Sequence, residues 1–481
     1  MIHVYTNREN YQYDLHALLK SFYPEHDVRV YAAEAQEEHQ DGEKQVIVQL
    51  FNDSINVILD IDVRKEYVHT YKNDTDVTKK ECKLSIYHDL CDYTGKTLPW
   101  GNLTGIRPTK LAMGMLAEGK EDAEIVAWLK AAHAISDEKA LLSLDIARRE
   151  KAILDRLHYE DGYSLYIGIP FCPTTCLYCS FTSYPIAVWR KRVEEYLQAL
   201  FQEIDFVVET YKNKILDTVY IGGGTPTTLE AAELDRLLQY VRNQFDFQQV
   251  TEFTVEAGRA DSITREKLAA LKKNGVTRIS VNPQTMKDET LKYIGRQHTV
   301  TQVKDAFWMA REAGFDNINM DIILGLPGEL ETDVQHTIDE ITQLNPDSLT
   351  VHSLAIKRAS KLSQWIEENG ITALHNTDNT MEIAQRGAYA LNMKPYYLYR
   401  QKNMSGNFEN VGYAREGKYG IYNILIMEEK QTIVACGAGS VSKRVYPDGR
   451  IERSENVKDV SQYIERIGEM IERKKHLLSD C

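Results

Sequence analysis

The chain has 481 residues, of which 43% are apolar and 27% are charged, and its 57 Lys and Arg against 71 Asp and Glu give a net charge of −14. This length exceeds one ordinary core and predicts about two or three domains, while the acidic balance disfavours a general nucleic-acid-binding surface. No apolar run approaches the roughly 20 residues of a membrane-spanning helix and the first residues lack a signal-peptide core, so we expect a cytoplasmic protein with reduced thiols.

The first 156 residues predict two regions. A helical stretch near residues 13–19 among strand-like runs at 2–5, 45–50 and 56–61 predicts a small α+β unit over residues 1–75. Residues 76–156 have the pattern of a mainly helical connecting region, which Gly and Pro interrupt within Leu98–Lys110. The basic side chains of that loop, Arg107 and Lys110, suit an anion, but a capped turn into the next helix explains the loop equally well.

From residue 157 to about 375, short β-branched runs alternate with longer stretches of helical periodicity, which is typical of β–α units and a parallel sheet. The predicted strands are Ser164–Ile169, Thr218–Ile221, Glu252–Val255, Arg278–Val281, Asn317–Ile323 and Ser348–Val351. The predicted helices are 188–211, 230–245, 264–273, 300–313 and 332–344. Six strands predict an α/β fold with a partial (β/α)6 barrel rather than a full eight-stranded one.

Residues 376–481 predict a small C-terminal α+β domain that covers the substrate pocket of the barrel. Its expected elements are a helix over 377–391, a Gly-rich turn over 413–420, strands at Tyr422–Met427 and Thr432–Ala435, and a final helix over 460–475.

Three cysteines, Cys172, Cys176 and Cys179, have the spacing C-x3-C-x2-C in the first β–α unit. A structural zinc site has four protein ligands, whereas a [4Fe–4S] cluster held by three thiolates leaves one iron open to another molecule. The spacing therefore favours a cluster, with a zinc loop that borrows a distant His or Cys as the alternative.

The run Tyr166–Phe181, followed by the Gly-rich Gly222–Thr227, resembles the radical S-adenosylmethionine (SAM) superfamily and, within it, the oxygen-independent coproporphyrinogen III dehydrogenase-like group. The resemblance implies that Cys172, Cys176 and Cys179 hold a [4Fe–4S] cluster to which SAM binds. It also implies a low-potential electron donor of the flavodoxin or ferredoxin type, because reduction of the cluster cleaves SAM to a 5′-deoxyadenosyl radical.

The residues that would bind SAM follow from the same resemblance. Apart from Arg296, which lies in the run Ile294–His298, each lies on or just beyond a predicted strand, where active sites of parallel-strand barrels gather. Glu256, Gln284 and Asp321 would contact the polar edge of SAM, and Arg296 would pair with its carboxylate. The remaining contacts would be Tyr166, the loop residues Gly222, Gly223, Gly224 and Thr225, whose backbone can approach a ligand closely, and Ala355 on the adenine side. Tyr178 and Phe181 would shield the cluster, and His298 would belong to the framework.

Two positions differ from the coproporphyrinogen group, which carries a fourth, non-ligating cysteine at Phe181 and a histidine at Gly168. The haem-chaperone branch shares the phenylalanine but has a C-terminal His-Asn motif that residues 403–413 lack. The runs Trp100–Lys110 and Tyr399–Met404 are similar to a third branch, the HemZ-type proteins.

The resemblance implies an enzyme acting on a tetrapyrrole, most concretely the oxidative decarboxylation of coproporphyrinogen III to protoporphyrinogen IX in anaerobic haem synthesis. A haem-trafficking protein with a regulatory cluster is one alternative, and radical methylation or ring opening of a tetrapyrrole is another. Basic residues at 357–358 and 400–402 are candidates for binding the propionates of the substrate, or are solvated charges.

Overall fold

The computed structural model describes residues 1–33, 44–70, 78–105, 107–180, 183–357, 360–401 and 404–478. Phe181, Arg358 and Lys402 therefore lie outside the described residues. The chain divides into two compact units: unit 1 comprises 1–148, 364–373 and 398–409, and unit 2 comprises the rest. The four-part division drawn from the sequence stays a prediction.

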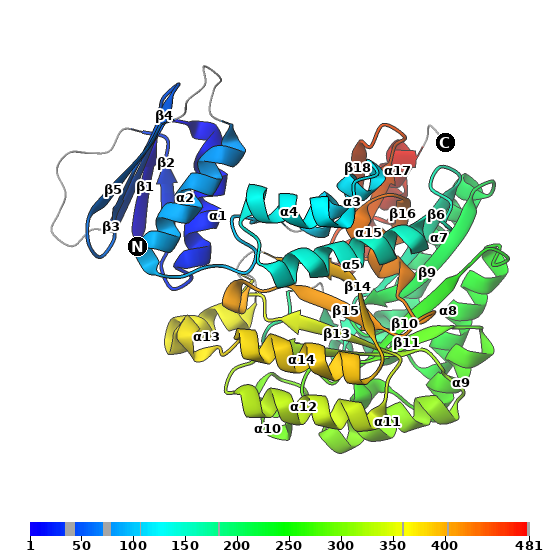
Figure 1. Ribbon diagram of the computed structural model, residues 1–481. Helices are drawn as coiled ribbons and strands as arrows, with labels where there is room; N and C mark the ends of the chain where they lie inside the picture. The colour runs from blue at the N-terminus through cyan, green and yellow to red at the C-terminus, as the bar shows by residue number, and fades with distance from the viewer. Residues whose placement is uncertain are drawn as a thin grey trace. The chain divides into compact units, whose positions relative to one another are not determined.

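Unit 1 begins with a five-stranded sheet in the order β2-β1-β3-β4-β5 (Figure 1). Strand β1 (Ile2–Thr6) is parallel to β2 (Val28–Tyr31) and β3 (Lys44–Leu50), and an antiparallel meander adds β4 (Ser54–Asp60) and β5 (Lys65–Thr70). Apolar side chains of the sheet pack with α1 (Gln12–Phe22) and α2 (Lys79–Thr94) in one buried cluster. The α+β character expected of this region is confirmed.

The helices of the predicted connecting region are α2 and three that follow it: α3 (Thr109–Ala117), α4 (Asp122–His133) and α5 (Asp137–Leu154). Local signals set the bounds of α2. Thr78 and Glu81 form a capping box at its start, and Gly95, with φ of 68°, ends it in the left-handed conformation that glycine adopts readily.

Two runs far apart in the sequence meet inside unit 1. The guanidinium of Arg400 donates to the carbonyl oxygen of Leu103 at 2.5 Å, 297 residues away, and lies over the Trp100 ring. The Trp100 indole N–H and the Lys139 ammonium both donate to the Glu409 carboxylate, at 2.7 and 2.8 Å. Arg400 is thus a buried residue bonded to its own unit rather than a solvated charge, and these bonds do not favour it as a propionate ligand.

Unit 2 contains one eleven-stranded sheet in the order β14-β15-β13-β12-β11-β10-β9-β6-β16-β17-β18. Its middle is six parallel strands adjacent in chain order, which confirms the predicted partial (β/α)6 arrangement. These strands are β6 (Gly162–Ile169), β9 (Ile215–Gly223), β10 (Glu252–Gly258), β11 (Arg278–Val281), β12 (Ile318–Leu324) and β13 (Ser348–Ser353).

Helices cover the outer face of these strands, as Figure 1 shows for α8, α9, α11 and α12. The connecting helices are α7 (Val193–Tyr211), α8 (Ala231–Gln244), α9 (Arg265–Lys273), α10 (Asp288–Tyr293), α11 (Val300–Glu312) and α12 (Glu331–Leu344). The cysteine loop begins in the short strand β7 (Phe171–Cys172), and β8 (Tyr184–Pro185) and the one-turn α6 (Ile186–Trp189) follow it before α7. After β13 come α13 (Lys361–Asn369) and α14 (Asp378–Ala390), the latter packed on α12.

The C-terminal strands extend the same sheet. At one edge β15 (Asn410–Ala414) is antiparallel to β13 and is followed by β14 (Lys394–Tyr399). At the other edge β16 (Thr432–Cys436) adds a parallel neighbour to β6, and β17 (Val441–Val445) and β18 (Ile451–Glu455) complete the edge. The final helix is divided at Arg466 into α16 (Val460–Glu465) and α17 (Ile467–Leu478).

The strand predicted at Tyr422–Met427 is wrong, because these residues form helix α15 (Ile421–Glu428). The amide of Ile421, at its first turn, donates to the buried carboxylate of Glu252 at the start of β10. A short apolar run does not distinguish helix from buried strand, and this cap comes from a residue 169 positions earlier.

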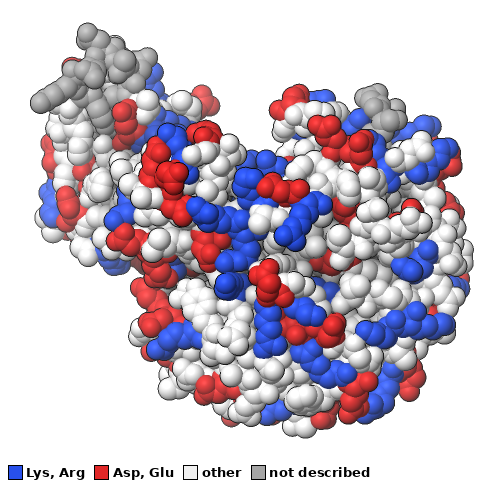
Figure 2. All heavy atoms as spheres, turned by 45° about the vertical axis from the view of Figure 1, so that its right-hand side comes forward, with Lys and Arg blue, Asp and Glu red and all other residues white. Residues whose placement is uncertain are grey.

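On the face that Figure 2 shows, positively and negatively charged side chains are intermixed. Within the described ranges, none of the helices combines the length and the apolar character needed to cross a membrane.

Candidate functional site

The C-terminal ends of the parallel strands in unit 2 carry most of the predicted site residues. The strands are in register, with Tyr166 of β6 beside Tyr220 of β9 and Tyr220 beside Thr254 of β10. Because side chains alternate along a strand, Tyr166, Tyr220 and Glu256 share the inner face of the sheet. The register continues across β11, because Glu256 pairs with Ser280 and Ser280 pairs with Asn319 of β12. Asp321, two residues after Asn319, therefore lies on the same face.

The cysteine loop follows β6 and is fixed to a second loop. The Thr174 hydroxyl donates to the carbonyl oxygen of Gly295 at 2.7 Å, and the Leu177 amide donates to that of Ile294 at 2.9 Å. Residues 294 and 295 directly precede Arg296, so these bonds hold the predicted SAM-carboxylate ligand against the predicted cluster loop.

The three thiols lie close enough for their charges to interact. Burial, reinforced by Cys179 and Cys176, raises the pKa of the Cys172 thiol to about 11, although a hydrogen bond with Thr225 opposes it. Among the described residues, no three His, Cys, Asp or Glu side chains are grouped to hold one metal ion. A [4Fe–4S] cube binds each thiolate through a different iron, so the three thiolates need not converge on one ion.

Close packing explains the glycines of the loop after β9. An ideal Cβ on Gly224 would lie 2.5 Å from the carbonyl oxygen of Phe171, and one on Gly222 would lie 2.8 Å from the Tyr220 ring. Gly223 has φ of 104° and approaches the Tyr166 hydroxyl. The amides of Gly224 and Thr225 donate to backbone carbonyls of residues 169 and 171, so they bind within the protein.

Two carboxylates face each other across the inner face of the sheet. Burial raises the pKa of Glu256 to about 7, an effect that the negative charge of Asp321 reinforces and a hydrogen bond from Tyr220 opposes. Burial also acts to raise the pKa of Asp321, but His352 and a 2.6 Å hydrogen bond from Asn319 lower it overall. The site therefore holds one carboxyl group that titrates near neutral pH beside one that stays ionised.

Gln284 and Arg296 present buried polar atoms without protein partners. Gln284 has the left-handed φ of 70°, held by backbone hydrogen bonds to β12, and its side-chain oxygen is unpaired. Arg296 donates to the carbonyl oxygen of Asn282, while its Nε is unpaired. Both residues are 7% exposed. Buried polar groups are normally hydrogen-bonded, so this donor and this acceptor fit a polar ligand such as the amino-acid end of SAM.

Tyr166 belongs to an aromatic group that sequence reasoning only partly found. Its ring stacks on Tyr220 and on Tyr422 of α15, and the Tyr220 and Tyr422 ring centroids are 4.4 Å apart. Tyr422 was missed because its segment was assigned to a strand. Ala355 lies half-buried two residues beyond β13.

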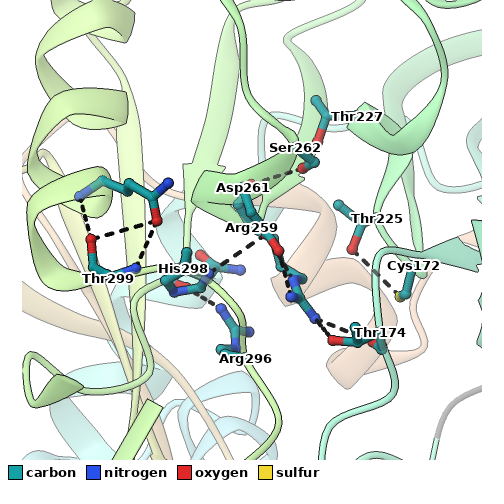
Figure 3. A network of polar contacts seen from close by, with 12 residues as sticks. Cys172, Thr174, Thr225, Thr227, Arg259, Asp261, Ser262, Arg296, His298 and Thr299 are labelled. Carbon is teal, nitrogen blue, oxygen red and sulfur yellow. Dashed lines mark hydrogen bonds and ion pairs between the residues drawn. The ribbon is translucent and has the colours of Figure 1, made fainter. Parts of the chain in front are cut away.

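A buried polar network beside the cysteine loop was also missed. Figure 3 shows Arg259, just after β10, between Asp261 on one side and Thr174 on the other. His298 lies 3.6 Å from Asp261 with its side chain buried, and its framework role stays a prediction. The sequence signal available was Arg259 and Asp261 directly after the strand that carries Glu256, which is where barrel active sites gather.

Comparison with known proteins identifies the family. Residues 166–341 match the radical SAM superfamily. The oxygen-independent coproporphyrinogen-III oxidase-like protein HemZ of Bacillus subtilis is 42% identical over 419 residues, 84% of this chain and 84% of that protein. The heme chaperone HemW of the same organism is 32% identical over 64% of this chain and 76% of its own length.

Among solved structures, coproporphyrinogen III oxidase (HemN) from Escherichia coli, described as a radical SAM enzyme, superposes with a TM-score of 0.52. It is 22% identical, and the match covers 67% of this chain and 72% of that one, so it shows a shared fold. Proteins of the radical SAM superfamily bind a [4Fe–4S] cluster and SAM. The chain belongs to the radical SAM superfamily and, within it, to the oxygen-independent coproporphyrinogen-III oxidase-like group that includes HemZ.

Proposed function

We propose that this chain is a radical SAM enzyme that decarboxylates a tetrapyrrole, with coproporphyrinogen III as substrate and protoporphyrinogen IX as product. The observation that supports the proposal is a three-thiol loop bonded to the residues that precede Arg296, whose buried Nε is unpaired, in a chain 42% identical to HemZ. We place the reaction in the cytoplasm, with a flavodoxin- or ferredoxin-type protein as electron donor.

Within this proposal, Cys172, Cys176 and Cys179 hold the cluster. The reduced cluster would supply the electron that cleaves SAM to a 5′-deoxyadenosyl radical. The Arg296 guanidinium is suited to the SAM carboxylate, because a buried Arg pairs with a carboxylate through parallel hydrogen bonds. The side-chain oxygen of Gln284 can accept from the SAM ammonium group.

The remaining side chains would orient the bound molecule. Glu256 and Asp321 can accept hydrogen bonds from the ribose hydroxyls, and the Tyr166 ring would close one side of the site. The Gly222–Thr225 loop and Ala355 would border it. Orientation and exclusion of water are what the protein contributes to such a reaction.

Two propionate groups of the substrate would react in the same way. The side chain would give one hydrogen atom to the 5′-deoxyadenosyl radical, which becomes 5′-deoxyadenosine, and would lose one electron and one carbon dioxide molecule, so that a vinyl group remains. The carboxylate becomes the carbon dioxide, and the electron passes to an acceptor outside the protein.

The test is an anaerobic incubation of reconstituted protein with coproporphyrinogen III, SAM and dithionite. We expect two carbon dioxide molecules per protoporphyrinogen IX, and none from the Cys176→Ser variant or without SAM. Release of 5′-deoxyadenosine without decarboxylated porphyrin would reject this substrate, while methyl transfer or ring opening would assign a different radical reaction.

A second candidate, a haem-trafficking function, is favoured by the 32% identity to HemW. It predicts that haem binds stoichiometrically and that SAM turns over little. An absorption titration with haem tests it directly. A saturable Soret shift at one haem per chain, in protein that releases no carbon dioxide, would support trafficking over decarboxylation.

A further inference from the structure

We propose that Arg259 positions the cysteine loop and shifts the [4Fe–4S] cluster toward its reduced state by placing a buried positive charge beside Cys176. This inference rests on the cluster binding proposed above and concerns a residue outside the predicted SAM contacts.

The geometry of Arg259 is set from both sides (Figure 3). Nη1 donates to the Thr174 hydroxyl at 2.7 Å and to the Thr174 carbonyl oxygen at 3.2 Å, and it lies 4.0 Å from the Cys176 Sγ. Nε and Nη2 donate to the two carboxylate oxygens of Asp261 at 3.0 and 2.6 Å. The guanidinium thus bridges the end of β10 and the cysteine loop.

An arginine suits this position better than a lysine does. The planar fork makes the paired bonds to Asp261 and still has Nη1 free to bind the loop, whereas an ammonium group lacks that shape. Arg259 is 3% exposed, so water screens its charge little.

The effect on the cluster follows from charge. A [4Fe–4S] cluster with three thiolates gains one negative charge on reduction, and a buried cation close to a thiolate stabilises that charge. Hydrogen bonds to the sulfurs and the surrounding net charge are established means of setting cluster potentials. The carboxylate of Asp261 partly offsets the cation, but it lies on the side of the guanidinium opposite Thr174.

A second arginine near the same cysteine needs a separate role. The Arg296 side chain interacts with Tyr178 and Cys176 of the cysteine loop, so its charge also lies beside this loop. Burial lowers the pKa of Arg296, but these interactions raise it more. In the proposed function the SAM carboxylate neutralises Arg296. Arg259, already paired with Asp261, keeps its contact with the loop whether or not SAM is bound.

The experiment compares anaerobically reconstituted holoenzyme of the natural chain with Arg259→Gln and Arg259→Lys variants, using EPR-monitored redox titration without SAM. We expect Arg259→Gln to shift the midpoint potential to more negative values. Arg259→Lys should keep a potential near that of the natural chain, because the charge is retained. Both variants should lose iron to a chelator several-fold faster, because the bonds to Thr174 are weakened.

Arg265→Gln is the matched control, since Arg265 begins α9 and its side chain is 66% exposed in a surface pair with Glu312. It should change neither potential nor iron retention. An unshifted potential in Arg259→Gln with four irons bound would overturn the electrostatic role, as would an equal shift in Arg259→Lys. If Arg259→Gln binds no cluster, Asp261→Asn decides: it removes the charge that offsets the guanidinium and should shift the potential to less negative values, and an unshifted potential would overturn the electrostatic role. A natural chain that binds no four-iron cluster would instead reject the proposed function itself.

Discussion

At Gly224 the backbone leaves no room for a side chain. Because the clash would be with the backbone of Phe171, which directly precedes Cys172, it cannot be relieved by a rotamer change. We expect Gly224→Ala to lower the free energy of unfolding by about 1–3 kcal/mol, a typical cost of overpacking. Urea unfolding of the apoprotein measures this loss, and iron analysis after reconstitution should show less bound cluster.

The control for Gly224 is Gly468→Ala in α17, where an added Cβ meets nothing within 4 Å. Alanine favours a helix over glycine, so this variant should be neutral or stabilised by up to about 1 kcal/mol. If Gly224→Ala unfolds like Gly468→Ala and binds full iron, the loop has more freedom than its close approach to Phe171 indicates.

Glu256 makes stability depend on pH. Burial raises its pKa from 4.5 to about 7 in the folded protein, so the folded state binds this proton more tightly than the unfolded state does. The resulting stabilisation is complete below pH 4.5 and is lost as the pH rises through 7. The natural chain therefore loses stability over this range and Glu256→Gln does not. We expect the difference in free energy of unfolding to shift by about 1–3 kcal/mol in favour of Glu256→Gln as the pH rises from about 5 to about 7.5. Urea unfolding of both apoproteins at the two pH values tests it, and parallel pH profiles would contradict it.

Helix α15 depends on a side chain from another element. The Glu252 carboxylate accepts from the amides of Ile421 and Tyr422 at the first turn, and the positive charge of Arg278 lies near it. Glu252→Ala would leave the helix uncapped and the buried Arg278 with less compensation. We expect a loss of about 2–4 kcal/mol in urea unfolding, and about 1 kcal/mol for Glu252→Gln, which keeps an acceptor.

Hydrogen exchange should locate that effect in the amides of α15. The matched variant is Glu230→Ala, which removes a cap from α8, where the carboxylate is 67% exposed. Its cost should stay near or below about 1 kcal/mol, because an exposed cap is partly replaced by water. Equal losses from the two positions would show that burial of the Glu252 cap adds nothing.

The contrast between β11 and α15 shows what the sequence could predict. β11 was predicted residue for residue at Arg278–Val281, because β-branched runs alternating with helical stretches repeat along the barrel. α15 was not, because an isolated apolar run of this length suits either structure and its cap comes from β10. Arg259 was missed for a related reason: its role depends on Thr174 and Cys176, which only the fold brings near it.

At the scale of the whole molecule, unit 1 is assembled from three separate stretches of chain. Residues 398–409 lie far along the sequence from the helices that they contact, and one of these contacts joins two buried charges. Lys139 of α5 is 5% exposed and donates to Glu409, 1% exposed, across 270 residues. The N-terminal region is therefore part of the folded core of unit 1, and the chain after β14 completes that core.

This assembly predicts that one substitution in α5 loosens a segment 270 residues away. Lys139→Met would leave the Glu409 carboxylate buried with a compensating charge removed, which typically costs about 3–5 kcal/mol. Limited trypsin digestion should then cut after Arg400, which is 4% exposed in the natural chain. The double variant Lys139→Met with Glu409→Gln should recover part of both losses, because it removes the buried carboxylate that Lys139→Met leaves without its ammonium partner. Lys120→Met, which breaks an exposed pair with Glu124, should change neither measurement. Equal protection of Arg400 in all of these variants would mean that residues 398–409 hold their place without the Lys139–Glu409 pair.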